Sequence, residues 1–310
     1  MKKLISLLSI FIITIGLCGC DYHDIPFLDK PKKAGFLLQN AAVYNNLLSM
    51  NVLYNAMLNS YDPDSEISKQ IMRDSKRMDD SDDYLEKLRS DTKDKNYLEL
   101  NGYLSTSVKK FSSMLNNINS LTSAAIMDLQ NSDNDFYDPI DNASSALKNT
   151  ATESRKEYDQ YMNKFLDSYK VESKLLGDSS EYYIPDSLKK GYLEQLKYTF
   201  ENAIDARKYM AVQLADLQKN FCENQLSYID SALDNANKVE SAFSSNDDMY
   251  SAISEFIEAF TKLSEEYHYI SDKLGKNPDP SADIVQPKSY IDNDLKNDLN
   301  KFKESYDKLY

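Results

Sequence analysis

The residues with the clearest chemistry are the cysteines, because a thiolate is a good nucleophile. Two of the three stand in Leu17-Cys18-Gly19-Cys20, directly after an apolar run over residues 4–17 that two lysines precede. A positive end, a short apolar core and small residues before a cut are the order of an export signal. A thiol at the new amino terminus can form a thioether with a diacylglycerol. This stretch therefore predicts cleavage between Gly19 and Cys20 and lipidation of Cys20.

These four residues resemble the lipobox of bacterial lipoproteins, with a leucine three places before the cysteine and a small residue directly before it. The apolar run is shorter than the roughly 20 residues of a membrane-spanning helix, which favours a removed signal peptide over an anchor. We therefore predict membrane attachment through acyl chains, palmitate among them, on Cys20. The alternative is an ordinary secretory signal cut nearby, in which Cys20 has no role.

The charge of the chain narrows the choice of partners. Its formal net charge is −14, and removal of the signal peptide makes it more negative because Lys2 and Lys3 leave with it. Such a balance repels nucleic-acid phosphates and anionic lipid headgroups alike. We therefore expect no nucleic-acid partner, and we expect the lipid on Cys20 to supply the membrane attachment.

The remaining candidates for chemistry are few. Cys222 is the one cysteine that lipidation and cleavage would leave, so no internal disulfide is expected, and a core position is favoured over a reactive one. His23 and His268 lack a spacing typical of metal or catalytic sites.

The acidic runs at residues 79–83 and 131–138 lack the glycine of a calcium loop, so the first is interpreted as a solvated helix start or bend. We find no phosphate loop, nucleophile elbow or zinc motif, and we predict no cofactor, no metal and no enzyme.

The elements that must position any site are helices. Glycine is scarce, at seven residues, and β-branched residues are few. The composition and the apolar spacing predict an all-α fold, an elongated bundle of about six to seven long helices. The expected helices span residues 34–61, 65–94, 96–129, 139–176, 187–239 with a break near 220–224, 247–274 and 289–309. Asp186 is a predicted N-cap, the run Asn246-Asp247-Asp248 is predicted to cap the helix that follows it, and Gly177 and Gly275 are predicted to end the helices before them.

The expected domain organisation has three parts. Residues 1–19 are the signal peptide, residues 20–33, with Pro26 and Pro31, form an extended lipid-anchored tether, and residues 34–310 form the helical bundle, with room for a subdivision near 177–186. The aromatic face of the helix at 139–176 is interpreted as core rather than as a recognition surface. The paired tyrosines Tyr182 and Tyr183 stand on a predicted loop, where they offer contact area with a polar tip.

A resemblance to a known family rests on these residues. The lipobox, the short tether, Tyr44-Asn45-Asn46-Leu47 in the first long helix and Phe136-Tyr137-Asp138 before another helix are similar to the YiiG-like bacterial lipoproteins, a family of unassigned function. The resemblance implies an all-helical extracytoplasmic domain. It implies no catalytic residues.

The sequence as a whole predicts a protein of the bacterial cell envelope, lipid-anchored and facing the periplasm or the exterior. Asp21 resembles the residue that retains enterobacterial lipoproteins in the inner membrane, which favours that membrane. The leading hypothesis is a helical interaction or scaffold module with a protein or envelope partner. The alternatives are a binding protein for a small ligand or cation, and an envelope hydrolase that uses paired carboxylates.

Overall fold

All regular structure in the described part of the chain is helical. The computed structural model describes residues 26–59, 65–131, 138–178, 181–209, 215–243, 247–279 and 281–309. Within these ranges the all-α prediction is confirmed. In the described part of the chain, eight helices have 21 residues or more, where about six to seven were predicted, and one further helix is short. None of the helices in these ranges is both long and apolar enough to cross a bilayer.

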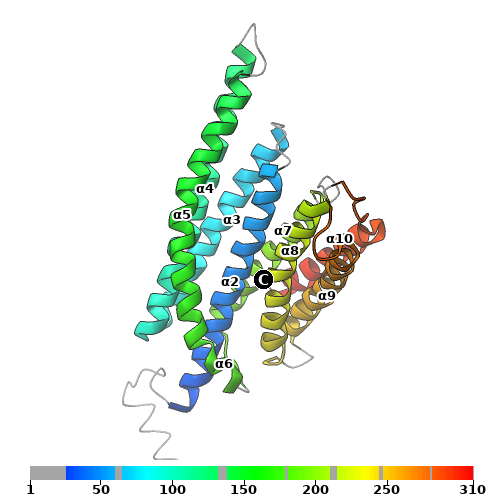
Figure 1. The fold of residues 1–310 in the computed structure, drawn as a ribbon. Coiled ribbons are helices and arrows are strands. Elements are labelled where there is room, and N and C mark those ends of the chain that lie inside the picture. Colours follow the sequence, from blue (N-terminus) through cyan, green and yellow to red (C-terminus); the bar gives the residue numbers. More distant parts are fainter. Residues whose placement is uncertain are drawn as a thin grey trace, which may run out of the picture.

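The helices run up and down along one elongated body (Figure 1). Their bounds are α2 Pro26–Asn59, α3 Ser65–Ser90, α4 Lys95–Asn131, α5 Asp138–Glu172, α6 Lys174–Asp178, α7 Asp186–Arg207, α8 Ala215–Glu240, α9 Asp248–Leu274 and α10 Ser289–Leu309. The α4–α5 pair reaches past the other helices at the end opposite to α6. The chain enters α2 at the α6 end.

Helix α2 is the centre of the bundle. It packs against α7 and α8 on one side and against α3 and α4 on the other. The predicted apolar stripe of α2 accordingly lies in the core, with Val43, Leu47 and Met50 at most 1% exposed. Buried residues on both sides of the 177–186 region belong to one continuous hydrophobic core. A helix with two packed faces needs the broad apolar surface that this sequence carries.

The prediction of an extended tether over residues 20–33 was wrong from Pro26 onward, because α2 already begins there and contains Pro31. A proline inside a helix lacks the amide donor and its ring crowds the carbonyl four residues before it, which is the reason that the two prolines favoured an extended segment in the sequence. The carbonyl of Pro31 accepts a hydrogen bond from the amide of Tyr183 at 3.1 Å, which links the start of α2 to the segment before α7. Residues 20–25 of the predicted tether, and all of the predicted signal peptide, lie outside the described residues.

Two other predicted boundaries were also wrong. The long helix at 187–239 is interrupted between Arg207 and Ala215, whereas residues 220–224 lie inside α8. Gly177 lies within α6 rather than capping α5, which ends at Glu172. No glycine or proline marks either break, so local propensity gave no sign of them.

The predicted caps had mixed outcomes. The Asp247 carboxylate accepts a hydrogen bond from the Met249 amide at 2.8 Å, and Gly275 ends α9 with a φ of 73°, as predicted. Asp186 is not the N-cap of α7, because Pro185 occupies that position without a side-chain hydrogen bond. The Asp186 carboxylate instead pairs with Lys189, one turn along the helix, at 2.8 Å.

Candidate functional site

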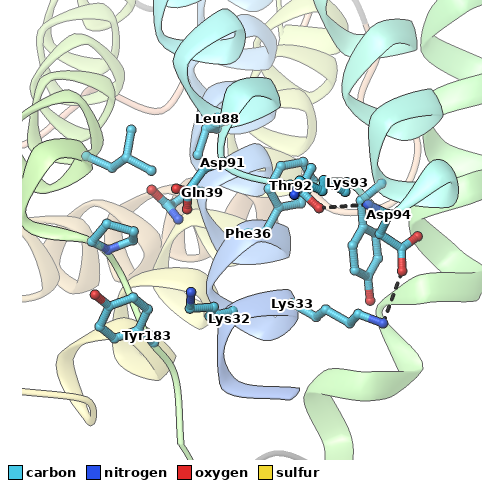
Figure 2. A pocket seen from close by; sticks show the side chains of 13 residues that line it. Lys32, Lys33, Phe36, Gln39, Leu88, Asp91, Thr92, Lys93, Asp94 and Tyr183 are labelled. Carbon is cyan, nitrogen blue, oxygen red and sulfur yellow. Dashed lines mark hydrogen bonds and ion pairs between the residues drawn. The ribbon is translucent and has the colours of Figure 1, made fainter. Parts of the chain in front are cut away.

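A pocket of about 240 Å³ opens at the end of the bundle where the chain enters α2 (Figure 2). Three separate segments form this α2-end pocket: the part of α2 from Lys32 to Gln39, the connection between α3 and α4, and the segment that leads into α7. Its charged lining residues are Lys32, Lys33, Lys93, Asp91 and Asp94, and its aromatic ones are Phe36, Tyr97 and Tyr183. Groups of both charge signs therefore line one small cavity.

One wall of the α2-end pocket depends on a glycine. The segment before α7 lies so close to α2 that a Cβ on Gly35 would be 2.0 Å from the carbonyl oxygen of Tyr183. That approach allows the hydrogen bond from the Tyr183 amide to the Pro31 carbonyl. Tyr183 keeps 47% of its surface exposed beside the pocket. Gly35 thus permits a backbone contact that any larger residue would block.

The opposite wall is organised by Asp94. Its carboxylate accepts a hydrogen bond from the Asn96 amide at 3.0 Å, where α4 begins, and it pairs with the Lys33 ammonium at 3.0 Å. Partial burial raises the pKa of Asp94, but the hydrogen bond and charge of Lys33, together with the backbone amides of Asn96 and Tyr97, outweigh it and lower the pKa. The Asp94 side chain is therefore an anion at neutral pH.

Aromatic rings hold both lysines of α2. The Lys33 ammonium lies 5.8 Å from the centre of the Tyr97 ring, which is stacked on Phe36 at a centroid distance of 5.5 Å. The Lys32 ammonium lies 5.8 Å from the centre of the Tyr183 ring. Figure 2 shows the two lysines leaving α2 in different directions, Lys33 toward Asp94 and Lys32 toward the side of Tyr183 and Asp91. Lys33 and Asp94 therefore form an ion pair on one side of the cavity, and Lys32 lies on the other side.

A second polar feature is buried between α2, α3 and α7. The Asn46 amide donates to the Gln195 side-chain oxygen at 2.9 Å and to the Ser81 hydroxyl at 3.1 Å. Asn202 donates to the Asn46 oxygen at 3.0 Å and to the Ser49 hydroxyl at 2.9 Å. Hydrogen bonds between buried amides specify which helix faces meet, because another register would leave these groups without partners. This network orients the three helices.

The network continues to a buried carboxyl group. Asp74 of α3 is only 2% exposed, and Arg77 donates to its carboxylate at 3.2 Å. Arg77 also pairs with Glu201 of α7 at 2.7 Å. Burial is the largest effect on Asp74 and raises its pKa to about 7, because the attraction of Arg77 offsets only part of it and Asp205 and Glu201 add repulsion. Asp74 lies inside a helix interface and not in a cleft.

A third polar feature fastens the connection between α9 and α10. Arg207, at the end of α7, forms a buried ion pair with Glu266 of α9 and a pair with Asp292 of α10 at 2.6 Å. The Lys288 amide donates to Glu266 at 2.9 Å. Gln218 of α8 exchanges two hydrogen bonds with the backbone of Val285, at 2.8 and 2.9 Å. These contacts hold an extended segment that has no regular structure of its own.

The residues for which the sequence predicts lipidation and cleavage, Cys20 and Gly19, lie outside the described residues, as do Asp21 and His23. Cys222 is fully buried, and burial raises the pKa of its thiol to about 12, which confirms the core interpretation. The His268 side chain is 58% exposed, with its Nε2 atom 3.9 Å from the Asp230 carboxylate.

The acidic run at residues 79–83 is neither a helix start nor a bend, since it lies in the middle of α3. Ser112 of α4 donates to Asp79 at 3.0 Å, Tyr198 of α7 donates to Asp80 at 2.9 Å, and Ser105 of α4 donates to Asp82 at 2.6 Å. Across the described ranges, no group of three histidine, cysteine or acidic residues is arranged to hold a metal. The run links α3 to its neighbours.

The aromatic face predicted at residues 139–176 contributes to the core through several of its described side chains, although Leu166 of the same face is 37% exposed. Tyr158, Met162 and Phe165 are buried, and Phe165 packs against Tyr44 of α2.

The sequence did not predict the α2-end pocket, because Lys32, Asp91 and Tyr183 are far apart in the chain and none belongs to a motif. The one available signal was the pair of loop tyrosines, Tyr182 and Tyr183.

Comparisons of the chain with protein-family models, with curated proteins and with solved structures found no match.

Proposed function

We propose that this chain is a lipid-anchored interaction module of the bacterial cell envelope, which holds a protein or envelope partner at a distance from the membrane. The proposal is carried by the positions of the predicted anchor and of the exposed tyrosines along the bundle. Helix α2, the first helix after the predicted acylation site, begins at the α6 end of the bundle (Figure 1). Exposed tyrosines gather at the other end of the α7–α10 half, on Tyr269 of α9 and Tyr290 of α10.

The exposed tyrosines have the character of a contact surface. Tyr269 is 44% exposed and Tyr290 is 59% exposed, and the Lys288 ammonium lies 5.0 Å from the centre of the Tyr269 ring. Tyrosine supplies a large contact area with a polar tip and loses little rotamer freedom on binding. The resemblance to YiiG-like lipoproteins agrees with an extracytoplasmic helical domain and belongs to the same proposal.

A second candidate function, binding of a small ligand, is favoured by the α2-end pocket. That pocket opens to the surface and is smaller than the roughly 300–1,000 Å³ typical of sites for whole small molecules. A hydrolase would need two carboxyl groups with different protonation states facing one cleft. Asp74, whose pKa is raised, is buried in a helix interface away from Asp91 and Asp94 of the pocket. The interaction module is therefore the function we propose.

The anchor is tested by metabolic labelling of the full chain with palmitate in a bacterium. We expect label on the wild-type protein, and no label on the Cys20→Ala variant. Cys222→Ala is the matched control and should keep the label, because that buried thiol is not the acylation site. Label on Cys20→Ala, or an intact Met1 in the mature wild-type protein, would contradict the proposal.

The partner surface is tested by placing a photo-crosslinking residue at position 290 of the full-length protein in its own envelope. We expect one specific product, which the Tyr269→Ala substitution reduces several-fold. Tyr183→Ala, which removes an exposed tyrosine at the other end of the bundle, should leave that product unchanged. The proposal of a partner at this surface would be refuted by a product whose yield Tyr269→Ala does not change, or by no product above that of a sample kept in the dark.

A further inference from the structure

Two lysines meet at one exposed tyrosine, where α9 ends and α10 begins. The Lys288 ammonium lies 5.0 Å and the Lys273 ammonium 5.7 Å from the centre of the Tyr269 ring. Lys288 also lines a cavity of about 210 Å³ together with Tyr290, which is 59% exposed. We call these four residues the Tyr269 surface. It combines two cations with two exposed aromatic rings.

The cations of the Tyr269 surface are not neutralised by the protein. Within the described part of the chain, no carboxylate oxygen lies within 4.0 Å of the Lys273 or the Lys288 ammonium. Lys262, which also belongs to α9, pairs with Glu258 and Asp298, both at 2.9 Å. An ammonium beside an aromatic face is attracted to the ring but keeps its full charge. Both lysines can therefore pair with an anion from another molecule.

A buried ion pair fixes the position of Lys288. The Lys288 amide donates to the Glu266 carboxylate at 2.9 Å, and the Lys288 carbonyl accepts from Arg207 at 3.4 Å. The side chains of Arg207 and Glu266 are only 3% and 1% exposed. A buried ion pair adds little net stability, because both charges lose their hydration. This pair instead holds the backbone beneath the Tyr269 surface, and a pre-organised surface loses less entropy on binding.

The charge of the remaining molecule restricts the kind of anion. The chain has a formal net charge of −14, and exposed acids lie next to the lysines: Asp272 precedes Lys273, and Asp294 lines the same cavity as Lys288. A long polymer of phosphates would meet these acids together with the lysines and would be repelled. Single acidic side chains on a folded protein can face the lysines without facing the acids. Tyrosine rings suit such a partner, because tyrosine is enriched in protein interfaces.

We propose that the Tyr269 surface binds the acidic side chains of a protein partner, with aspartate or glutamate carboxylates paired with Lys273 and Lys288. This inference rests on the proposed function and assigns a chemical class to its partner. Charge pairs at the edge of an interface act mainly on the rate of association and on the choice of partner. The rings of Tyr269 and Tyr290 would supply the apolar contact area.

The test treats the full-length protein in its own envelope with a water-soluble carbodiimide. The reagent activates a carboxylate, and a lysine amine in contact with that carboxylate displaces the reagent and forms an amide. We expect a cross-linked peptide that joins Lys273 or Lys288 to an aspartate or glutamate of the protein that photo-crosslinks to position 290. Lys170, at an exposed position of α5, is the matched control and should give no such peptide.

Substitutions of Lys288 separate its charge from its amine. Lys288→Arg keeps the positive charge but has no primary amine, so it should retain the photo-product at position 290 and lose the carbodiimide product at position 288. Lys288→Glu and Lys273→Glu should each reduce the photo-product several-fold, and Lys170→Glu should leave it unchanged. Thermal unfolding should be the same for all variants, because these side chains are exposed. An unchanged photo-product in both Lys288→Glu and Lys273→Glu would overturn the proposal.

The composition of the products distinguishes the remaining outcomes. Mass spectrometry of the photo-product at position 290 should find a peptide adduct, and an adduct that contains phosphate without peptide would overturn the proposal in favour of a phosphate polymer. Absence of any photo-product at position 290 would refute the proposed function itself. A photo-product without carbodiimide coupling at Lys273 or Lys288 would refute only the acidic character of the partner.

Discussion

Replacement of Asp74 by asparagine is expected to stabilise the protein at neutral and higher pH and to leave its stability unchanged in acid. Asp74 is 2% exposed, and its pKa is raised from 3.8 to about 7, chiefly by burial. Asparagine has nearly the same shape and carries no charge to bury. Arg77 would keep its pair with Glu201 at 2.7 Å and its hydrogen bond to Asn202 at 2.9 Å. The substitution therefore removes a buried charge without stranding the arginine.

The sign of the pH dependence follows from the two pKa values. Between pH 3.8 and about 7 the Asp74 carboxyl group is mostly protonated in the folded state and mostly ionised in the unfolded state. Stability consequently falls as pH rises through that range, by up to about 1.4 kcal/mol per pH unit. Above it, the ionised carboxylate costs at most about 4 kcal/mol relative to the protonated form. For a chain of this length that corresponds to roughly 5 to 8 °C in melting temperature.

The assay is thermal unfolding of the acylated full chain in neutral detergent, followed by far-ultraviolet circular dichroism from pH 4 to pH 8. We expect the curves of wild type and Asp74→Asn to coincide near pH 4 and to separate as pH rises, with the variant melting higher. Asp83→Asn, at an exposed position of the same helix, is the matched control and should follow the wild type throughout. Parallel curves for Asp74→Asn and wild type across the range would refute the reasoning.

Three further perturbations follow from the packing. Glu266→Ala removes the buried carboxylate partner of Arg207, whose side chain is 3% exposed and which then keeps only the pair with Asp292, and it should lower the free energy of unfolding in urea by about 3 kcal/mol. An unchanged midpoint would contradict the burial of the pair. Gly35→Ala should displace residues 181–185 and make Tyr182 and Tyr183 accessible to cleavage by chymotrypsin. Gly177→Ala should not, because an added Cβ at that position meets no atom within 4 Å. Equal cleavage of the two variants would contradict the close contact at Gly35. Cys222, with a thiol pKa of about 12, should react with maleimide only after denaturation, and rapid labelling of the folded protein would place it at the surface.

The helical content could be predicted because it depends on local periodicity and composition. Val43, Leu47 and Met50 fall on one stripe of the sequence and lie in the core, as expected. The end of α9 at Gly275 could also be predicted, because a positive φ favours glycine regardless of the surroundings. The break after Arg207 could not, since it accompanies an ion pair with Glu266, 59 positions away in the chain.

The sequence by itself determined the helical class, the apolar stripes and the short segment on which the hypothesis of lipidation at Cys20 rests, because each depends on residues that are close together in the chain. Only the tertiary structure decided that Lys32, Asp91 and Tyr183 line one cavity, and that Asp74 is buried beside Arg77. The physical reason is that charge, burial and cavity shape depend on which helix faces meet. In this bundle that choice depends on contacts between residues distant in the chain.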